Sequence, residues 1–109
     1  MKLKLLTESI KKKLIDNYNK NQNDGTLSFK AVVKLFNPSG IGTWFLSELN
    51  PKDNIAFGLC CLQEEEVGYV SLEELKSLKS SPFGLGIERD LYFKPNKKTL
   101  DECRTKPHP

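Results

Sequence analysis

The segment IGTWFLSELNPKDNIAFGLCCLQ, Ile41–Gln63, predicts the centre of the fold. Two apolar runs, residues 41–49 and 55–63, have the composition of strands, and the turn-forming sequence NPKDN separates them. So short a link joins strands that run antiparallel. The second run is apolar at nearly every position, which is typical of a central strand covered on both faces. We therefore expect an antiparallel sheet with residues 55–63 near its middle.

A helix and a further strand precede this segment. Apolar residues alternate with polar ones from Leu27 to Leu35, which predicts a half-buried strand. Upstream of it, Thr7 is a suitable N-cap, and the helix that follows ends before Asp24-Gly25. The apolar side chains of this helix recur at helical spacing: Leu6, Ile10, Leu14, Ile15 and Tyr18.

The elements that follow complete an α+β fold. Residues 64–70 predict a short fourth strand, and the capping box Ser71–Glu74 predicts a second helix from about residue 72. The run IERDLYF, residues 87–93, predicts a fifth strand or an extended edge segment. We expect a small antiparallel meander of four to five strands, packed by the N-terminal helix and one short second helix.

The length and charge of the chain limit its organisation. At 109 residues it can form one modest core. We therefore expect a single α+β domain at residues 1–95, followed by a basic, flexible tail at 96–109. Residues 1–20 hold six lysines and two acids, whereas residues 21–93 hold six bases and ten acids. The net charge of +3 is therefore a property of the two ends, and it predicts nucleic-acid binding only weakly.

Cysteine and histidine usage predicts neither disulfides nor zinc. Cys60 and Cys61 are adjacent in a strand, so they point to opposite faces, and Cys103 lies in the polar tail. His108 is the only histidine, and no zinc-ligand spacing is present. The apolar runs are shorter than the roughly 18 residues of a membrane span. We expect a cytoplasmic protein with no membrane partner.

The run IERDLYF contains three consecutive charges. If it is extended, Arg89 shares a face with Ile87, Leu91 and Phe93 and is directed toward the core. A buried guanidinium needs a carboxylate partner. Glu48, which shares a strand face with Trp44 and Leu46, is the best candidate, and we predict a structural Glu48–Arg89 ion pair.

The other face of this run carries Glu88, Asp90 and Tyr92. Trp44 and Phe45 are neighbours on one strand, so one ring is expected to face the core and the other the opposite surface. Together these side chains predict an acidic and aromatic surface that binds a protein partner.

A metal site is the alternative use of the same acids. Glu88 and Asp90, about 6.5–7 Å apart at Cβ in a strand, could share Mg²⁺ or Mn²⁺ with Glu48 and activate water for phosphodiester hydrolysis. The sequence contains no GxSxG elbow and no phosphate-binding glycine motif, and Cys60 and Cys61 have no basic neighbour. These observations favour a protein without catalytic activity and without a cofactor.

Several motifs resemble a small domain family of unknown function that is widespread in bacteriophages, plasmids and conjugative elements. They are Thr43-Trp44, Phe57–Leu59, Gly68–Leu72 and Ile87–Leu91. The resemblance covers roughly residues 5–95. It implies a cytoplasmic accessory protein of a phage or mobile element, and some members look to have been labelled as single-stranded DNA endonucleases.

Two functions are consistent with this resemblance. The first is a protein-binding module that inhibits a host enzyme or defence complex, which needs a surface and no chemistry. The second is a metal-dependent single-stranded DNA endonuclease, or a single-stranded DNA binder, that uses Glu48, Glu88 and Asp90 with lysines on the backbone phosphates.

Overall fold

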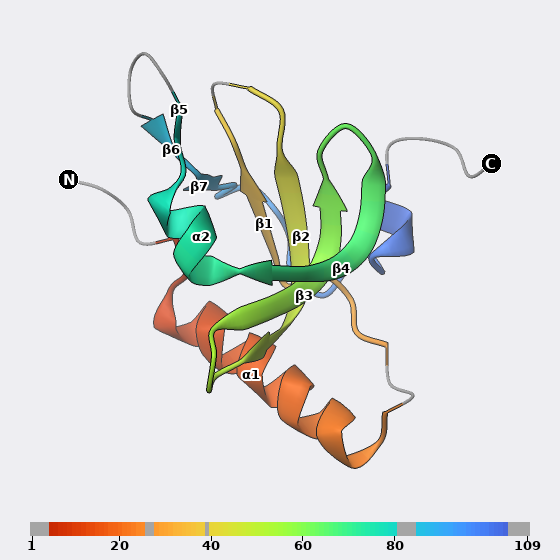
Figure 1. The fold of residues 1–109 in the computed structure, drawn as a ribbon. Helices are drawn as coiled ribbons and strands as arrows, with labels where there is room; N and C mark the ends of the chain where they lie inside the picture. The colour runs from red at the N-terminus through yellow and green to blue at the C-terminus, as the bar shows by residue number, and fades with distance from the viewer. Residues whose placement is uncertain (1–4, 26–27, 39, 81–84, 105–109) are drawn as a thin grey trace.

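The structure is a computed structural model that describes residues 5–25, 28–38, 40–80 and 85–104 (Figure 1). Its centre is a five-stranded antiparallel sheet of order β4-β3-β2-β1-β7. With its two helices, this sheet confirms the predicted α+β fold. The strands of this sheet are β1 (Val33–Phe36), β2 (Thr43–Asn50), β3 (Ile55–Cys61), β4 (Glu65–Ser71) and β7 (Glu88–Arg89).

Both predicted helices are present, and both begin at the predicted caps. The hydroxyl of Thr7 accepts a hydrogen bond from the backbone N–H of Ile10 at 3.2 Å, and that of Ser71 accepts one from Glu74 at 3.2 Å. The helices are α1 (Glu8–Asn23) and α2 (Leu72–Ser77), and a 3₁₀ turn, η1, covers Asp101–Cys103. A second, two-stranded sheet pairs β5 (Lys79–Ser80) with β6 (Leu85–Gly86).

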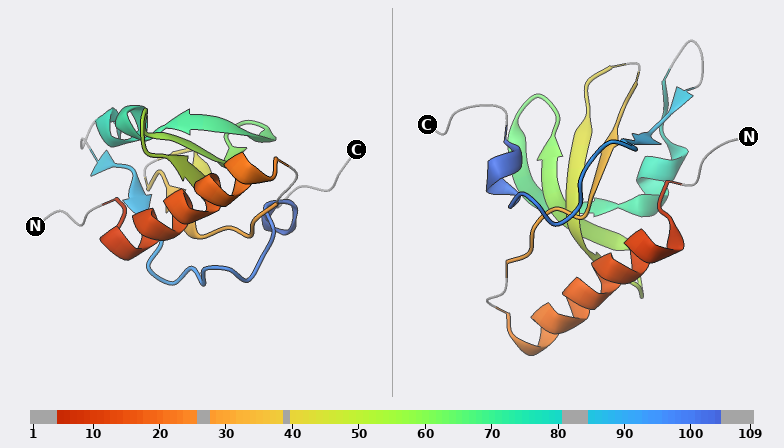
Figure 2. Two further views of the ribbon diagram at one scale, coloured as in Figure 1. Left: turned by 90° about the horizontal axis from the view of Figure 1, so that it is seen from below. Right: turned by 180° about the vertical axis from the view of Figure 1, so that it is seen from behind.

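Helix α1 lies across one face of the large sheet (Figure 2). Leu14 of α1 and Leu72 and Leu75 of α2 are buried there against strands β1 to β3. We call this the first cluster, and it holds ten of the fifteen buried hydrophobic residues in the described ranges. Its buried members are Leu14, Val32, Val33, Leu35, Trp44, Leu46, Leu49, Ala56, Leu72 and Leu75.

The C-terminal segment covers the opposite face of the sheet (Figure 2, right). Its backbone is tied to the chain before β1, because Ala31 donates to the carbonyl of Lys98 at 2.8 Å and Asn96 donates to that of Ala31 at 2.9 Å. This side of the sheet carries the second cluster, whose buried members are Ala31, Phe45, Leu59, Leu100 and Cys103.

The segment expected as a tail is therefore packed as far as the structure describes it, to Arg104. Leu100 and Cys103 are only 9% and 7% exposed. They are two apolar side chains in a largely polar run, and a sheet with a second apolar face needs such a cover.

Two expected strands are shorter in the structure. Strand β1 begins only at Val33, because Ala31 bonds to the C-terminal segment instead of continuing the ladder; Leu27 lies outside the described residues. Strand β7 covers two residues of the expected 87–93. It ends at Arg89, because the carboxylate of the next residue, Asp90, accepts the backbone N–H of Tyr92 at 2.9 Å and so turns the chain.

No helix in the described ranges is long and apolar enough to cross a membrane.

Candidate functional pocket

A β-bulge in β2 determines where the candidate site forms. Leu46 pairs with Gly58 of β3, but Glu48 pairs with the next residue, Phe57, so Ser47 is an extra residue between them. The bulge is held from two sides. The amide of Asn17 in α1 donates to the carbonyl of Ser47 at 3.0 Å, and the Ser47 hydroxyl donates to the carbonyl of Phe57 at 3.4 Å.

The bulge exchanges the faces on which Glu48 and Leu49 lie. In a regular strand Glu48 would share the face of Leu46, but Leu49 now enters the first cluster and pairs with Ala56. Glu48 lies beside Phe57, which packs against the second cluster.

This exchange overturns the predicted Glu48–Arg89 ion pair. Arg89 pairs with Leu35 of the first cluster, and its Nη1 donates to the carbonyl of Leu5 at 3.3 Å. Glu48 lies on the other side of the sheet and accepts from Asn21 of α1 instead. The prediction assumed an unbroken alternation along β2, which the bulge interrupts.

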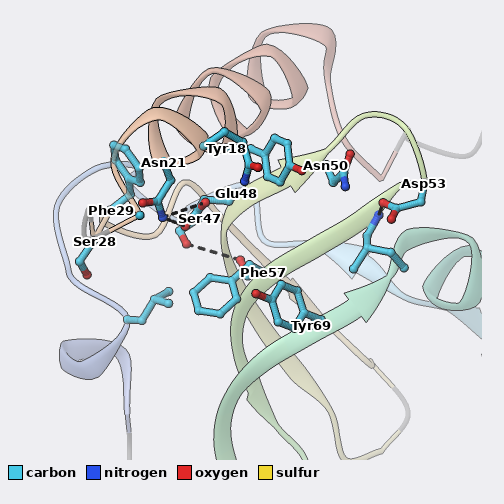
Figure 3. A pocket seen from close by; sticks show the side chains of 14 residues that line it. Tyr18, Asn21, Ser28, Phe29, Ser47, Glu48, Asn50, Asp53, Phe57 and Tyr69 are labelled. Carbon is cyan, nitrogen blue, oxygen red and sulfur yellow. Dashed lines mark hydrogen bonds between the residues drawn. The ribbon is translucent and has the colours of Figure 1, made fainter.

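A pocket of about 730 Å³ opens beside Glu48 (Figure 3). It lies between the end of α1, the bulge of β2, the first residues of β3, and β4. Four aromatic side chains line it, and all but Tyr69, which is exposed, are half-buried. They are Tyr18, Phe29, Phe57 and Tyr69, and the last two rings are tilted against each other with centroids 5.2 Å apart. Leu100 of the C-terminal segment also lines the pocket.

Glu48 is the buried acid of this pocket. It is only 7% exposed, and both of its carboxylate oxygens accept from the single amide nitrogen of Asn21, at 3.2 and 3.3 Å. These bonds are longer than the 2.7–2.9 Å typical of charge-assisted pairs. Burial raises the pKa of Glu48, and the Asn21 bond opposes that shift in part. The carboxylate has therefore lost water without gaining a strong partner.

The charge of the pocket is one-sided. Glu48 and Asp53 are its acids, and the described residues that line it include no lysine, arginine or histidine. The chain contains 17 lysine and arginine residues, so the absence of bases from this described lining does not follow from the overall composition. The arrangement suits a cationic group in an aromatic surround.

The predicted surface aromatics have different positions. Trp44 and Phe45 do point to opposite faces, but they are 4% and 8% exposed, because α1 covers one face and the C-terminal segment the other. Phe45 packs near Phe93, with ring centroids 5.9 Å apart. Neither ring is available to a partner.

Glu88, Asp90 and Tyr92 lie at the far edge of the sheet, around β7. Glu88 is exposed and Tyr92 is 93% exposed, but Asp90 pairs with Lys34 at 3.4 Å and also caps the turn after β7. Glu48 is in β2, on the other side of β1, so the structure does not bring the three predicted metal ligands together. Among the described residues, no three His, Cys, Asp or Glu side chains gather as a metal site.

The cysteines are poor nucleophiles. Burial raises the pKa of Cys60 and of Cys103, and burial with a hydrogen bond to Glu65 raises the pKa of Cys61 to about 11. All three are free thiols. At neutral pH they are protonated, and a thiol reacts as the thiolate.

Glu48 was a candidate residue from the sequence, but in other roles, and the other residues that build the pocket were not identified. One signal was present: Asn17, Tyr18 and Asn21 recur at i, i+1 and i+4 near the end of α1, where a polar cluster faces the sheet. The bulge at Ser47 had no such signal, because serine is compatible with either a regular or a bulged strand.

The comparisons with known proteins agree with the resemblance seen in the motifs. No curated protein and no solved structure matches the chain significantly. Residues 5–102, nearly all of the chain, match the family model described as protein of unknown function (DUF2958), and the chain belongs to this family.

Proposed function

We propose that this protein is a non-enzymatic binding module, and that its pocket receives a lysine or arginine side chain of a protein partner. The observation that carries the proposal is the buried carboxylate of Glu48, 7% exposed and weakly hydrogen-bonded, in a pocket whose described lining contains no base.

The energetic reason is that a cationic hydrogen-bond donor would lower the free energy of the buried Glu48 carboxylate. A buried carboxylate without a strong partner is costly, and a hydrogen-bonded cation offsets that cost. The rings of Tyr18, Phe29 and Tyr69 also line the pocket, and an aromatic ring can attract a cation over its face. The volume, about 730 Å³, falls within the range of pockets that bury a small ligand or a side chain with its neighbours.

The proposal extends to the cellular context that the motifs imply. The partner would be a host enzyme or defence complex, and the protein a cytoplasmic accessory factor of a phage or mobile element. The nuclease alternative gains no specific support, because Glu48 is separated from Glu88 and Asp90 by β1.

Blocked amino acids test the pocket directly. We would titrate the protein with N-acetyl-lysine methylamide and N-acetyl-arginine methylamide and follow the side-chain amide resonances of Asn21 by NMR. The neutral norleucine analogue, which is close to lysine in shape, reports binding without the charge.

The expected result is saturable binding of the cationic probes that weakens at least tenfold in Glu48→Gln, since a hydrogen bond to a charged group contributes about 1.5–3 kcal/mol. Glutamine keeps an acceptor for Asn21, so the pocket should remain intact. Glu66→Gln removes an exposed acid outside the pocket and should change nothing. Equal affinity for norleucine, or unchanged binding in Glu48→Gln, would contradict the proposal.

A further inference from the structure

Strand β4 is the outer strand of the large sheet on the side opposite β7 (Figure 1). It has seven residues and pairs with β3 along its whole length without a register shift. In an antiparallel ladder every second residue turns its N–H and C=O away from the neighbouring strand. An outer strand of this length therefore presents a row of backbone donors and acceptors.

Two hydrogen bonds that flank the ladder identify the outward residues. Leu62 donates to the carbonyl of Glu64, and Leu72 donates to that of Asn54, so even-numbered residues of β4 bond to β3. The odd-numbered residues, 65 to 71, face outward. Arg104 agrees with this assignment, because its Nη1 donates to the carbonyl of Glu65 from outside the sheet at 2.8 Å.

The outward backbone groups of Val67 and Tyr69 bond to no residue within the described ranges. Their side chains are 45% and 76% exposed. Proteins usually protect such an edge with proline, a bulge or charged side chains; β4 has no proline and no bulge, and its two charged residues, Glu65 and Glu66, are confined to its start. The open edge is therefore suited to receive another strand.

The charge around β4 indicates the charge of the strand that this edge would receive. Residues 64–66 are three glutamates, Glu73 and Glu74 follow the strand, and no base occurs from residue 64 to 75. A second copy paired antiparallel about Gly68 would bring the acids at the start of one β4 near those after the other. Like charges at both ends disfavour that dimer, whereas they attract a basic segment.

We propose that β4 accepts an extended, basic segment of a partner protein as a sixth strand of the sheet. Apolar side chains at alternate positions of that segment would lie beside Val67 and Tyr69, with lysine or arginine near its ends. This edge borders the pocket, because the ring of Tyr69 also lines it, but the edge does not include Glu48. Strands lie about 4.8 Å apart, so the added strand would be about 14 Å from β2 and Glu48, with the rings of Phe57 and Tyr69 between them.

A synthetic peptide of the sequence Lys-Val-Thr-Val-Thr-Val-Lys tests the edge, with Glu-Val-Thr-Val-Thr-Val-Glu as its acidic counterpart. Amide hydrogen exchange, measured by NMR, reports the N–H groups of Val67 and Tyr69. We expect the basic peptide to slow the exchange of both at least tenfold and the acidic peptide to leave it unchanged. Unchanged exchange of the two amides with saturating basic peptide would overturn the proposal.

Two variants and a modified peptide separate backbone pairing from charge attraction. Val67→Pro removes an outward N–H that β3 does not use, and should abolish binding, whereas Val67→Thr keeps the N–H and should bind as the wild type does. Should Val67→Pro not fold, a peptide N-methylated on the residues that face β4 gives the same test. Binding of that peptide as tightly as the unmodified one would refute strand addition.

The second copy is a distinguishable outcome. If Val67 and Tyr69 are already protected without peptide, and light scattering shows a dimer that Val67→Pro dissociates, the edge is an interface between copies and the proposal is overturned. Glu48→Gln should bind the basic peptide as the wild type does, so failure of the pocket proposal and failure of this one have different signatures.

Discussion

Leu100→Ala tests whether the C-terminal segment is part of the fold. Leu100 is 9% exposed in the second cluster, and truncating a buried leucine to alanine costs about 2–5 kcal/mol. The cluster has five buried members and Leu100 also lines the pocket, so the space left behind is partly open to solvent. We therefore expect the low end, about 2–3 kcal/mol, a large fraction of the 5–15 kcal/mol typical of a domain.

Urea unfolding, followed by the fluorescence of Trp44, measures this loss. Leu91→Ala is the matched control, because it makes the same truncation in the same segment at a residue that is 61% exposed. It should change the free energy of unfolding by less than about 0.5 kcal/mol. If Leu100→Ala is no more destabilising than Leu91→Ala, the C-terminal segment does not pack on the second cluster, and Leu100 does not line the pocket.

Three further predictions concern the bulge, the pocket and the thiols. The pKa of Glu48 is raised above its ordinary value of 4.5, so its contribution to stability is present below pH 4.5 and lost as pH rises through the folded value. Glu48→Gln should therefore gain stability relative to the wild type between pH 4 and pH 7 in urea unfolding; a constant difference would refute the burial argument. In Gly58→Ala the new Cβ would overlap the carbonyl oxygen of Phe45, so we expect a loss of about 3 kcal/mol or more by the same assay. Gly68→Ala, with no atom within 4 Å, should be nearly neutral. Cys61, with its pKa of about 11, should react with iodoacetamide at pH 8 at least tenfold more slowly folded than in urea, and equal rates would contradict its burial.

The parts of the fold that could be predicted are those whose signal is local. A hydroxyl that can cap a helix, such as Thr7 or Ser71, contacts residues three positions away, so the sequence contains both partners. The hairpin of β2 and β3 is likewise determined by a short turn between two apolar runs. These elements lie where they were expected.

The site could not be predicted because it depends on one inserted residue. A strand alternates with period two, so a single bulge at Ser47 reverses the face of every residue after it. Glu48 was therefore assigned to the side of Arg89. The packing of Leu100 was not predicted for a related reason: the burial of an isolated leucine in a polar run depends on a strand face that is distant in the sequence.

The burial of Glu48, which raises its pKa, motivates the proposed function. The bulge already closes the core, because it places Leu49 in the first cluster and leaves Asn17 to bond the extra carbonyl. An amide at position 48 would satisfy Asn21 equally well without a buried charge. A group that costs stability in the free protein and sits in a pocket is best explained by the state in which that cost is offset. Under the proposed function, a cation bound among the aromatic rings would offset this cost.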